Sequence, residues 1–136
     1  MLLSDLDIAA RTVYGEARGE GPAGRRGVAQ VIVNRWRCDS GQFVRDDTLA
    51  TACLRHKQFS AWAKGDPNLA AMQEVGYKNR DLLDCMRHVL EAVRSDADTL
   101  TMGSLHYHAD HITPGWAEGH EPVVSLGHHK FYNTVN

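Results

Sequence analysis

The spacing of apolar residues changes at Asp98, and this change constrains the fold more than any other feature of the chain. Before Asp98, apolar residues recur at intervals of three and four, which is the period of an amphipathic helix. After it, residues 104–109 and 122–132 form short β-like runs, separated by a loop around Pro114. The sequence therefore predicts an α+β fold that is mostly helical, with a small C-terminal β element.

Local signals set the bounds of the first helix. Ser4 is a good N-cap residue, and the acidic residues directly after it favour the positive end of a helix dipole. A cluster of glycine and proline in residues 18–22 breaks the pattern. We expect this helix over residues 5–17.

A second helix follows the break. Pro22 suits the first turn of a helix, and the apolar face extends to about residue 37, before Asp39-Ser40-Gly41. Gly24 and Gly27 are poor helix formers, so a start later than Pro22 stays open.

The remaining helical signals lie before Asp98. Short helices are predicted from Thr48 to Cys53 and from Leu69 to Val75, on either side of a loop-like segment. Asn79 or Asp81 then opens the most regular helix of the chain. Its predicted buried stripe consists of Leu82, Leu83, Met86, Val89, Leu90 and Val93.

Composition limits the classes of function. A chain of 136 residues fits one domain, and a net charge of -2 gives no reason to expect a nucleic-acid partner. No apolar run approaches the roughly 18 residues of a membrane span. We expect a monomer without a membrane partner. Three cysteines without CxxC spacing favour reduced thiols, although a Cys38–Cys53 bridge stays open.

Glu16 stands out because it falls on the apolar stripe of the first predicted helix, with Ala9, Thr12 and Val13. Burial of an unpaired carboxylate is costly, so such a group tends to have a raised pKa. A carboxyl group that stays protonated near neutral pH is suited to general-acid catalysis. The alternative is a helix-end glutamate paired with Arg11 or Arg18.

The segment from His56 to Trp62 combines aromatic, amide and hydroxyl groups in a predicted loop. Aromatic faces stack on sugar rings, while Gln58 and Ser60 offer hydrogen bonds to hydroxyl and N-acetyl groups. The alternative is an ordinary loop with Phe59 and Trp62 in the core.

Six of the eight histidines lie between residues 106 and 129. His106 and His108 would share one face of a strand, so they could bind zinc as a pair in an amidase or peptidase. The chain lacks an HExxH motif, and the other nearby candidate ligands are Asp110, Glu118 and Glu121. We therefore favour histidines that line a polar cleft or lie on the surface.

The chain closes on the run at residues 126–132. Phe131 would pack on the core from a terminal strand, or the Tyr132 hydroxyl could contribute to a site.

Taken together, these segments resemble the catalytic domain of the SleB/CwlJ cell wall hydrolases, which include spore cortex-lytic enzymes and phage or gene-transfer-agent enzymes. The resemblance covers nearly the whole chain. Its motifs are ARTVYGEARGE at 10–20, VAQVIVNR at 28–35, Cys53 followed by QFS at 58–60, HYHA at 106–109, PGWA at 114–117 and GHHKFY at 127–132.

The resemblance implies a lysozyme-like or lytic-transglycosylase-like fold over residues 1–136, with peptidoglycan glycan strands as substrate. It implies that Glu16 is the catalytic acid and that Gln58 and Phe59 lie in the glycan-binding cleft. No metal and no cofactor is expected. With the residue-level arguments, the predicted substrate-binding residues are Gln58, Phe59, Ser60, Tyr107, His108, His129 and Tyr132.

Two reaction routes follow from a single catalytic acid. Hydrolytic glycosidases use a second carboxylate, for which the sequence offers Glu20, Asp110 or Glu118. A lytic transglycosylase needs none, because the Glu16 carboxylate can deprotonate the substrate's own C6 hydroxyl. We favour the second route over hydrolysis. Rivals from other classes are a zinc amidase and a non-catalytic glycan-binding domain.

Two departures from the family pattern matter. Residues 66–79 fit it poorly, so no role is transferred there. The N-terminus lacks the basic and apolar regions of a signal peptide, and no peptidoglycan-binding domain is evident. We therefore expect an endolysin-like phage protein that is made in the host cytoplasm and reaches the cell wall through a holin or at lysis.

Overall fold

A computed structural model describes residues 1–44, 47–55 and 59–135. It confirms a mostly helical α+β chain with a small C-terminal sheet. The α-helices are α1 (Leu3–Glu16), α2 (Pro22–Arg37), α3 (Leu49–Leu54), α4 (Leu69–Glu74) and α5 (Arg80–Arg94). The 3-10 turns are η1 (Gly41–Phe43), η2 (Ser60–Trp62) and η3 (Gly115–Ala117), and the strands are β1 (His106–Ala109), β2 (Val124–Leu126) and β3 (His129–Tyr132).

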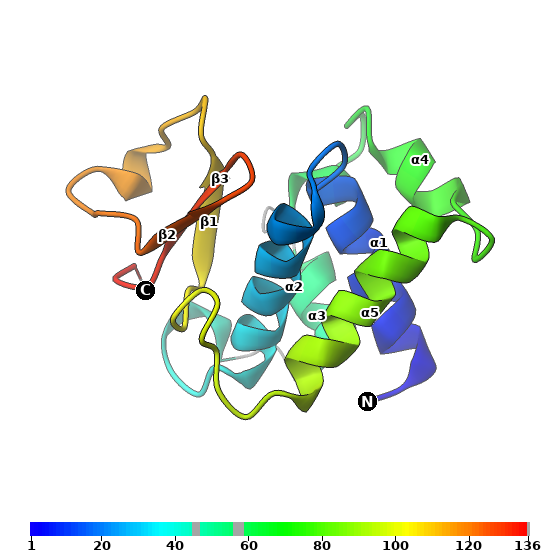
Figure 1. Ribbon diagram of the computed structural model, residues 1–136, viewed down its shortest axis with the longest axis horizontal. Coiled ribbons are helices and arrows are strands. Elements are labelled where there is room, and N and C mark those ends of the chain that lie inside the picture. Colours follow the sequence, from blue (N-terminus) through cyan, green and yellow to red (C-terminus); the bar gives the residue numbers. More distant parts are fainter. Residues whose placement is uncertain (45–46, 56–58, 136) are drawn as a thin grey trace.

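The core lies among the long helices, and the sheet lies to one side of them, beyond α2 (Figure 1). Helix α1 packs against α5, α3 and α2, and α2 also packs against α5. Ala9 and Val13 of α1, Val28 and Ile32 of α2, and Val89 of α5 are fully buried in one cluster. The predicted apolar stripe of the first helix is confirmed at its central positions, Ala9, Thr12 and Val13.

The sheet is antiparallel in the order β1-β3-β2. In its register, Ala109 pairs with His129 and Val124 pairs with Phe131. Phe131 also joins the sheet to α2, because its ring fills the space beside Gly27, where any Cβ would overlap it. The alternative of a later start for the second helix is therefore wrong. Helix α2 begins at Pro22, and Gly27 is used for close approach rather than as a break.

Two other local predictions also need correction. Ser4 is not the cap of α1, since the Asp5 carboxylate accepts a hydrogen bond from the Leu2 backbone N–H at 2.9 Å and the helix begins at Leu3. On α5, Asn79 caps the helix as predicted, but Leu83 is 45% exposed. The buried residues of α5 are Leu82, Cys85, His88, Val89 and Ala92, while Met86, Leu90 and Val93 of the predicted stripe are partly buried against the same core.

The shorter helices lie close to their predicted positions. Thr48 is the N-cap of α3, and its hydroxyl accepts a hydrogen bond from the Thr51 N–H. Helix α4 begins at Leu69, as predicted. The three thiols are not joined to one another, so the Cys38–Cys53 bridge is not formed. Within the described ranges, no helix has both the length and the apolar character needed to cross a bilayer.

Candidate active site

Glu16 is the last residue of α1 and is held by two hydrogen-bond donors from distant parts of the chain. The Tyr107 hydroxyl on β1 donates to Glu16 Oε1 at 2.5 Å, and the Ala61 backbone N–H on η2 donates to Oε2 at 3.1 Å. These contacts fix the carboxyl group between the helical part and the sheet. A general acid needs a fixed orientation of this kind toward its substrate.

The alternative of an arginine-paired glutamate is wrong. Arg11 binds Asp7 and the backbone carbonyls at the end of α4. Arg18 lies over the ring of Tyr14, 5.8 Å from its centroid. Neither Arg11 nor Arg18 therefore neutralises Glu16.

The environment raises the pKa of the Glu16 carboxyl above its ordinary value. Desolvation by burial is the largest cause, and it outweighs the opposing effects of the Tyr107 and Ala61 hydrogen bonds and of the Arg35 charge. The negative charge of Asp66 raises the pKa further. The protonated, proton-donating form of Glu16 is therefore favoured up to a higher pH than in a free glutamic acid.

Glu16 opens into a cleft of about 740 Å³, a volume in the range of ligand-binding pockets. Five predicted site residues line this cleft together: Glu16, Ser60, Tyr107, His108 and His129. Gly15, Arg35, Asp66, Pro67, Asn68, Ala109, His111 and Ile112 complete its described wall.

Three predicted substrate-binding residues are not among the described residues of that wall. Gln58 lies outside the described residues. Phe59 is only 3% exposed and packs in the core beneath the Arg35 guanidinium, as the alternative interpretation had it; it also borders a second hollow that shares Ser60 with the cleft. Tyr132 is buried behind the cleft, where its hydroxyl donates to His108 Nε2 at 2.7 Å.

The strand histidines form polar packing within the sheet. His106 and His108 share the buried face of β1, as predicted. His108 Nδ1 donates to the Ala109 carbonyl, while its Nε2 accepts from Tyr132, so both ring nitrogens are engaged. Burial and the Arg35 charge lower the pKa of His106 to about 4. In the part of the chain that the structure describes, no three potential ligands come together to hold a metal ion.

His129 is a better candidate for contact with substrate. It is buried, it lines the cleft, and its ring lies edge-on to Tyr107 with the centroids 5.2 Å apart. Burial lowers the pKa of His129, which favours the neutral imidazole. Its Nδ1 is buried and has no hydrogen-bond partner among the described residues.

The sequence reasoning missed Asp66 as a site residue. Residues 65–68 read Gly-Asp-Pro-Asn, which is typical of a turn, and Asp66 Oδ1 accepts from the Asn68 N–H at 2.8 Å within it. The turn nevertheless places Asp66 in the wall of the cleft that contains Glu16. A turn of Gly, Asp, Pro and Asn carries no signal that its carboxylate faces a site 50 residues back in the chain.

None of the three second carboxylates proposed from the sequence is among the described residues of the cleft wall. Glu20 instead holds the turn between β2 and β3. Its carboxylate oxygens accept from the His128 backbone N–H at 3.0 and 3.2 Å, beside Gly127. Glu20 thereby supports the strand that carries His129.

Comparison with known proteins gives consistent matches over this architecture. A family model described as Cell Wall Hydrolase matches residues 19–132. A spore cortex-lytic enzyme of Oceanobacillus iheyensis is 30% identical over 94% of the chain, and one of Halalkalibacterium halodurans is 28% identical over 96% of it. The chain spans 41% and 35% of the lengths of these two relatives.

Two solved structures share the fold. The catalytic domain of the Bacillus cereus SleB protein matches with a TM-score of 0.73 and 26% identity, over 97% of this chain and 91% of that one. The catalytic domain of a germination-specific lytic transglycosylase, SleB of Bacillus anthracis, matches with a TM-score of 0.72 and 27% identity, over 98% of this chain and 97% of that one. The expected lysozyme-like fold is thereby confirmed. The family model covers most of the chain and both structures match nearly all of it, so the chain belongs to the Cell Wall Hydrolase family, as a domain of the SleB/CwlJ type.

Proposed function

We propose that this domain cleaves the bond between N-acetylmuramic acid and N-acetylglucosamine in peptidoglycan, as a lytic transglycosylase with Glu16 as its single catalytic acid. The observation that carries the proposal is a carboxyl group of raised pKa, fixed by Tyr107 and Ala61, at the wall of a large cleft. The likeness to a chain described as a lytic transglycosylase supports the same reaction.

In the proposed reaction, Glu16 first gives its proton to the glycosidic oxygen as the bond to the muramic acid C1 breaks. The leaving sugar departs as an alcohol, and positive charge develops at C1 and the ring oxygen. The Glu16 carboxylate then removes the proton from the substrate's C6 hydroxyl, whose oxygen bonds to C1. The product is a 1,6-anhydro sugar, and Glu16 regains its proton for the next turnover.

Tyr107 and His129 have supporting parts in this proposal. Burial raises the pKa of Tyr107 well above its ordinary value, so its hydroxyl keeps its proton and continues to donate to Glu16 in both charge states. His129 presents its ring to the sugar at the cleft wall, and burial keeps that ring neutral by lowering its pKa. Both residues position groups, while the proton transfers belong to Glu16.

Hydrolysis of the same bond is the second candidate, and Asp66 favours it. Hydrolytic glycosidases place a second carboxylate across the scissile bond, and Asp66 lines the cleft with Glu16. Its carboxylate could activate a water molecule or stabilise positive charge at C1. The two candidates differ in their products, which makes them separable.

The test is digestion of purified sacculi followed by mass spectrometry of the released fragments. Anhydro-muramic ends are expected, and reducing muramic ends would overturn the transglycosylase proposal in favour of hydrolysis. Released stem peptides with intact glycan would indicate an amidase, and binding without release would indicate a glycan-binding domain. Asp66→Asn should keep the anhydro products, whereas a hydrolase that depends on Asp66 would lose its reducing ends.

We also propose how the protein reaches the cell wall. On the endolysin-like route, the protein is made in the cytoplasm and acts on the wall after release. A tagged chain should then stay in the cytoplasmic fraction of expressing cells until they lyse. Recovery from the periplasm or medium of intact cells would contradict it. Light scattering of the purified chain tests the expected monomer.

A further inference from the structure

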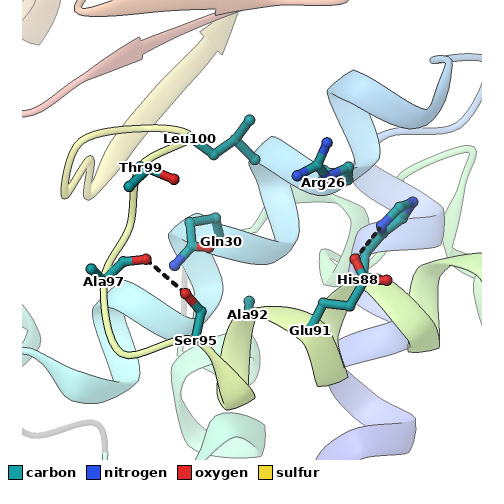
Figure 2. Close-up of a pocket in the computed structure, with 9 residues that line it drawn as sticks. All are labelled: Arg26, Gln30, His88, Glu91, Ala92, Ser95, Ala97, Thr99 and Leu100. Atoms are coloured by element: carbon teal, nitrogen blue, oxygen red, sulfur yellow. Dashed lines mark hydrogen bonds and ion pairs between the residues drawn. The ribbon is translucent and has the colours of Figure 1, made fainter.

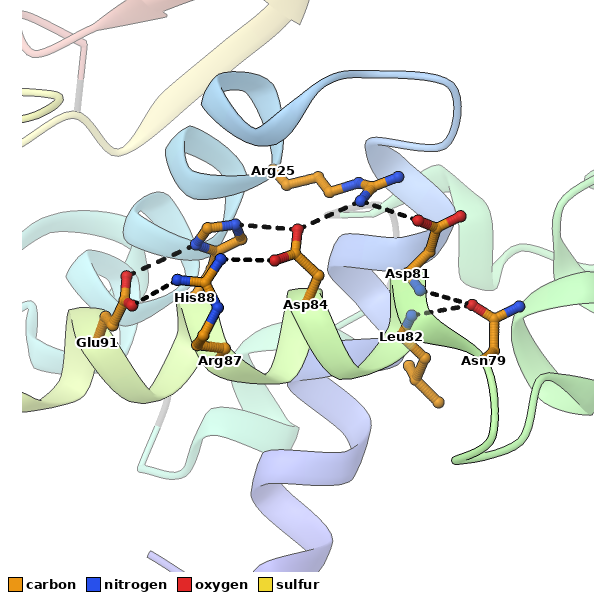
Figure 3. Close-up of polar contacts among 8 residues, drawn as sticks. All are labelled: Arg25, Asn79, Asp81, Leu82, Asp84, Arg87, His88 and Glu91. Carbon is orange, nitrogen blue, oxygen red and sulfur yellow. Dashed lines mark hydrogen bonds and ion pairs between the residues drawn. The ribbon is translucent and has the colours of Figure 1, made fainter.

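Helix α2 carries four arginines, and they face different parts of the molecule. Arg25 forms ion pairs with two aspartates of α5 (Figure 3). Arg26 lines a small pocket between α2, α5 and the loop that follows α5, away from the catalytic cleft (Figure 2). Arg37 donates hydrogen bonds to backbone carbonyls at the end of α5. Arg35 lies in the wall of the catalytic cleft, so it is the arginine of α2 that can act on the catalytic acid.

Arg35 is 5% exposed and contacts both segments that supply hydrogen bonds to the catalytic carboxyl group. Its Nε donates to the Leu105 carbonyl at 2.8 Å, two residues before Tyr107. Its guanidinium lies over the Phe59 ring, with Cζ 4.8 Å from the ring centroid, two residues before Ala61. Tyr107 and Ala61 are the two donors to that carboxyl group, so the position of both donors depends on Arg35.

A second aromatic ring fixes the guanidinium. Arg35 Cζ lies 4.5 Å from the ring centroid of Phe43 on η1. The Phe43 ring also lies beside His106, the first residue of β1, with the two centroids 5.5 Å apart. A planar guanidinium stacks on aromatic faces, and a lysine ammonium does not match that geometry. Arg35 is therefore held in one orientation at the start of β1.

Arg35 also gives the cleft wall a permanent positive charge. The titratable groups that share the described wall with it are Glu16, Asp66, Tyr107, His108, His111 and His129. From α3, the buried Cys53 thiol acts electrostatically on Tyr107. Among the described residues of the wall, only Arg35 stays positively charged throughout the pH range of an enzyme assay.

This charge offsets part of the effect of burial on the catalytic acid. Burial is the largest cause of the shift and raises the pKa of Glu16, while the Arg35 charge lowers it. A buried carboxyl group without such a charge would hold its proton more tightly. It would then give that proton less readily to a glycosidic oxygen.

We propose that Arg35 is a positioning residue for the catalytic acid: it holds both hydrogen-bond donors of Glu16 in place and faces the carboxylate that forms when Glu16 gives up its proton. This role rests on the proposed function, in which Glu16 is first a general acid and then a general base. Arg35 transfers no proton itself. Its charge stabilises the carboxylate between the two proton transfers, and its contacts keep the Tyr107 and Ala61 donors aimed at the two carboxyl oxygens.

The test is a pH titration of Glu16 by NMR without substrate, on a chain whose glutamate carboxyl carbons carry ¹³C. The Glu16 signal is assigned by its absence in Glu16→Gln. Arg35→Met keeps an unbranched side chain but removes the charge and the donor, so Glu16 should titrate at a higher pH than in the wild type. Arg35→Lys keeps the charge and should titrate nearer to the wild type. Arg25→Met is the matched control on the same helix, because it removes ion pairs to α5 and should leave the Glu16 titration unchanged.

The positioning contacts are tested in Arg35→Lys, which also covers the case in which Arg35→Met does not fold. The lysine ammonium is a point charge that cannot reproduce the planar contact with the two rings. The Ala61 backbone N–H resonance should therefore shift, and the rate of sacculus digestion at the optimum pH should fall about tenfold or more. Arg25→Met should keep both the resonance and the rate close to those of the wild type.

Four outcomes would overturn the proposal. They are a wild-type Glu16 titration in Arg35→Met, an equal shift in Arg25→Met, a titration in Arg35→Lys as far from the wild type as in Arg35→Met, or an Arg35→Lys chain with the wild-type rate and Ala61 resonance. The NMR measurements use no substrate. If the predicted shifts are seen but the wild type releases no fragments from sacculi, the proposed function fails alone. If the wild type releases anhydro products and the Arg35 variants behave like it, this role of Arg35 fails alone.

Discussion

Glu16 is not paired with Arg11 or Arg18. Its carboxyl group is held instead by one hydroxyl and one backbone N–H. Because the proposed reaction needs its proton, Glu16→Gln should lower the rate of sacculus digestion by about 10²-fold or more, the usual contribution of general acid catalysis. The amide keeps the shape of the side chain, so the circular dichroism spectrum should match the wild type. Digestion at the wild-type rate would refute the assignment.

The same substitution has a stability consequence whose sign is fixed by the raised pKa. A carboxyl whose pKa is higher in the folded chain than in the unfolded chain makes folding less favourable as pH rises above the ordinary glutamate value of about 4.3. Glu16→Gln should therefore unfold at a higher temperature than the wild type at pH 7. The difference should shrink toward pH 4, and a variant less stable than wild type at pH 7 would contradict this.

Tyr107 affects the titration of Glu16 through its hydrogen bond. That bond lowers the pKa of Glu16, so Tyr107→Phe should raise it and shift the alkaline limb of the pH–rate profile to higher pH. The rate at the optimum should fall, because one of the two donors that orient the carboxyl is lost. Tyr14→Phe, on the same helix as Glu16, is the matched control and should leave the limb in place. A limb that stays unmoved in Tyr107→Phe would show that another group sets it.

At the scale of elements, the contact between α2 and β3 depends on a glycine. Gly27→Ala adds a methyl group against the Phe131 ring, and overpacking of this kind costs about 1–3 kcal/mol, while alanine gains about 1 kcal/mol of helix propensity. We expect a net loss of stability in urea unfolding. Gly115→Ala, which meets open space, should be nearly neutral. In a double-mutant cycle, Phe131→Leu should remove much of the penalty, and strict additivity would argue against this contact.

The elements that could be predicted are those with strong local signals. Asn79 caps α5 through its own side chain, and Pro22 sits in the first turn of α2, so both starts were readable from a few neighbouring residues. The glycines of α2 left a later start open, because their use depends on Phe131, over 100 residues away. The exposure of Leu83 could not be predicted for a similar reason, because the face that α5 turns toward the core is set by its neighbours α1 and α2.

At the scale of the whole molecule, the candidate site could be predicted only in part. Glu16 was identified from helix periodicity alone, and family resemblance brought Tyr107 and His129 to it. The resemblance also selected Phe59, which the folded chain places in the core rather than in the cleft wall. Asp66 could not be found, because only the packing of η2 and α4 against α1 brings its turn beside Glu16.

The whole fold should lose stability in mild acid because several histidines are buried as neutral rings. Burial lowers the pKa of His106 to about 4 and also lowers those of His88 and His129, whereas unfolded histidines bind protons near pH 6.5. The unfolded chain therefore takes up more protons as pH falls from about 6.5 toward 4, which favours unfolding. Glu16 opposes this trend, because its raised pKa lets the folded chain bind a proton more readily than the unfolded chain does. It is one group against three histidines, so the histidines should determine how stability changes with pH. Melting temperatures should fall over that window, and less steeply in His106→Gln than in the exposed control His111→Gln. A melting temperature that stays constant from pH 7 to 4, or equal slopes in the two variants, would show that the buried rings do not control acid stability.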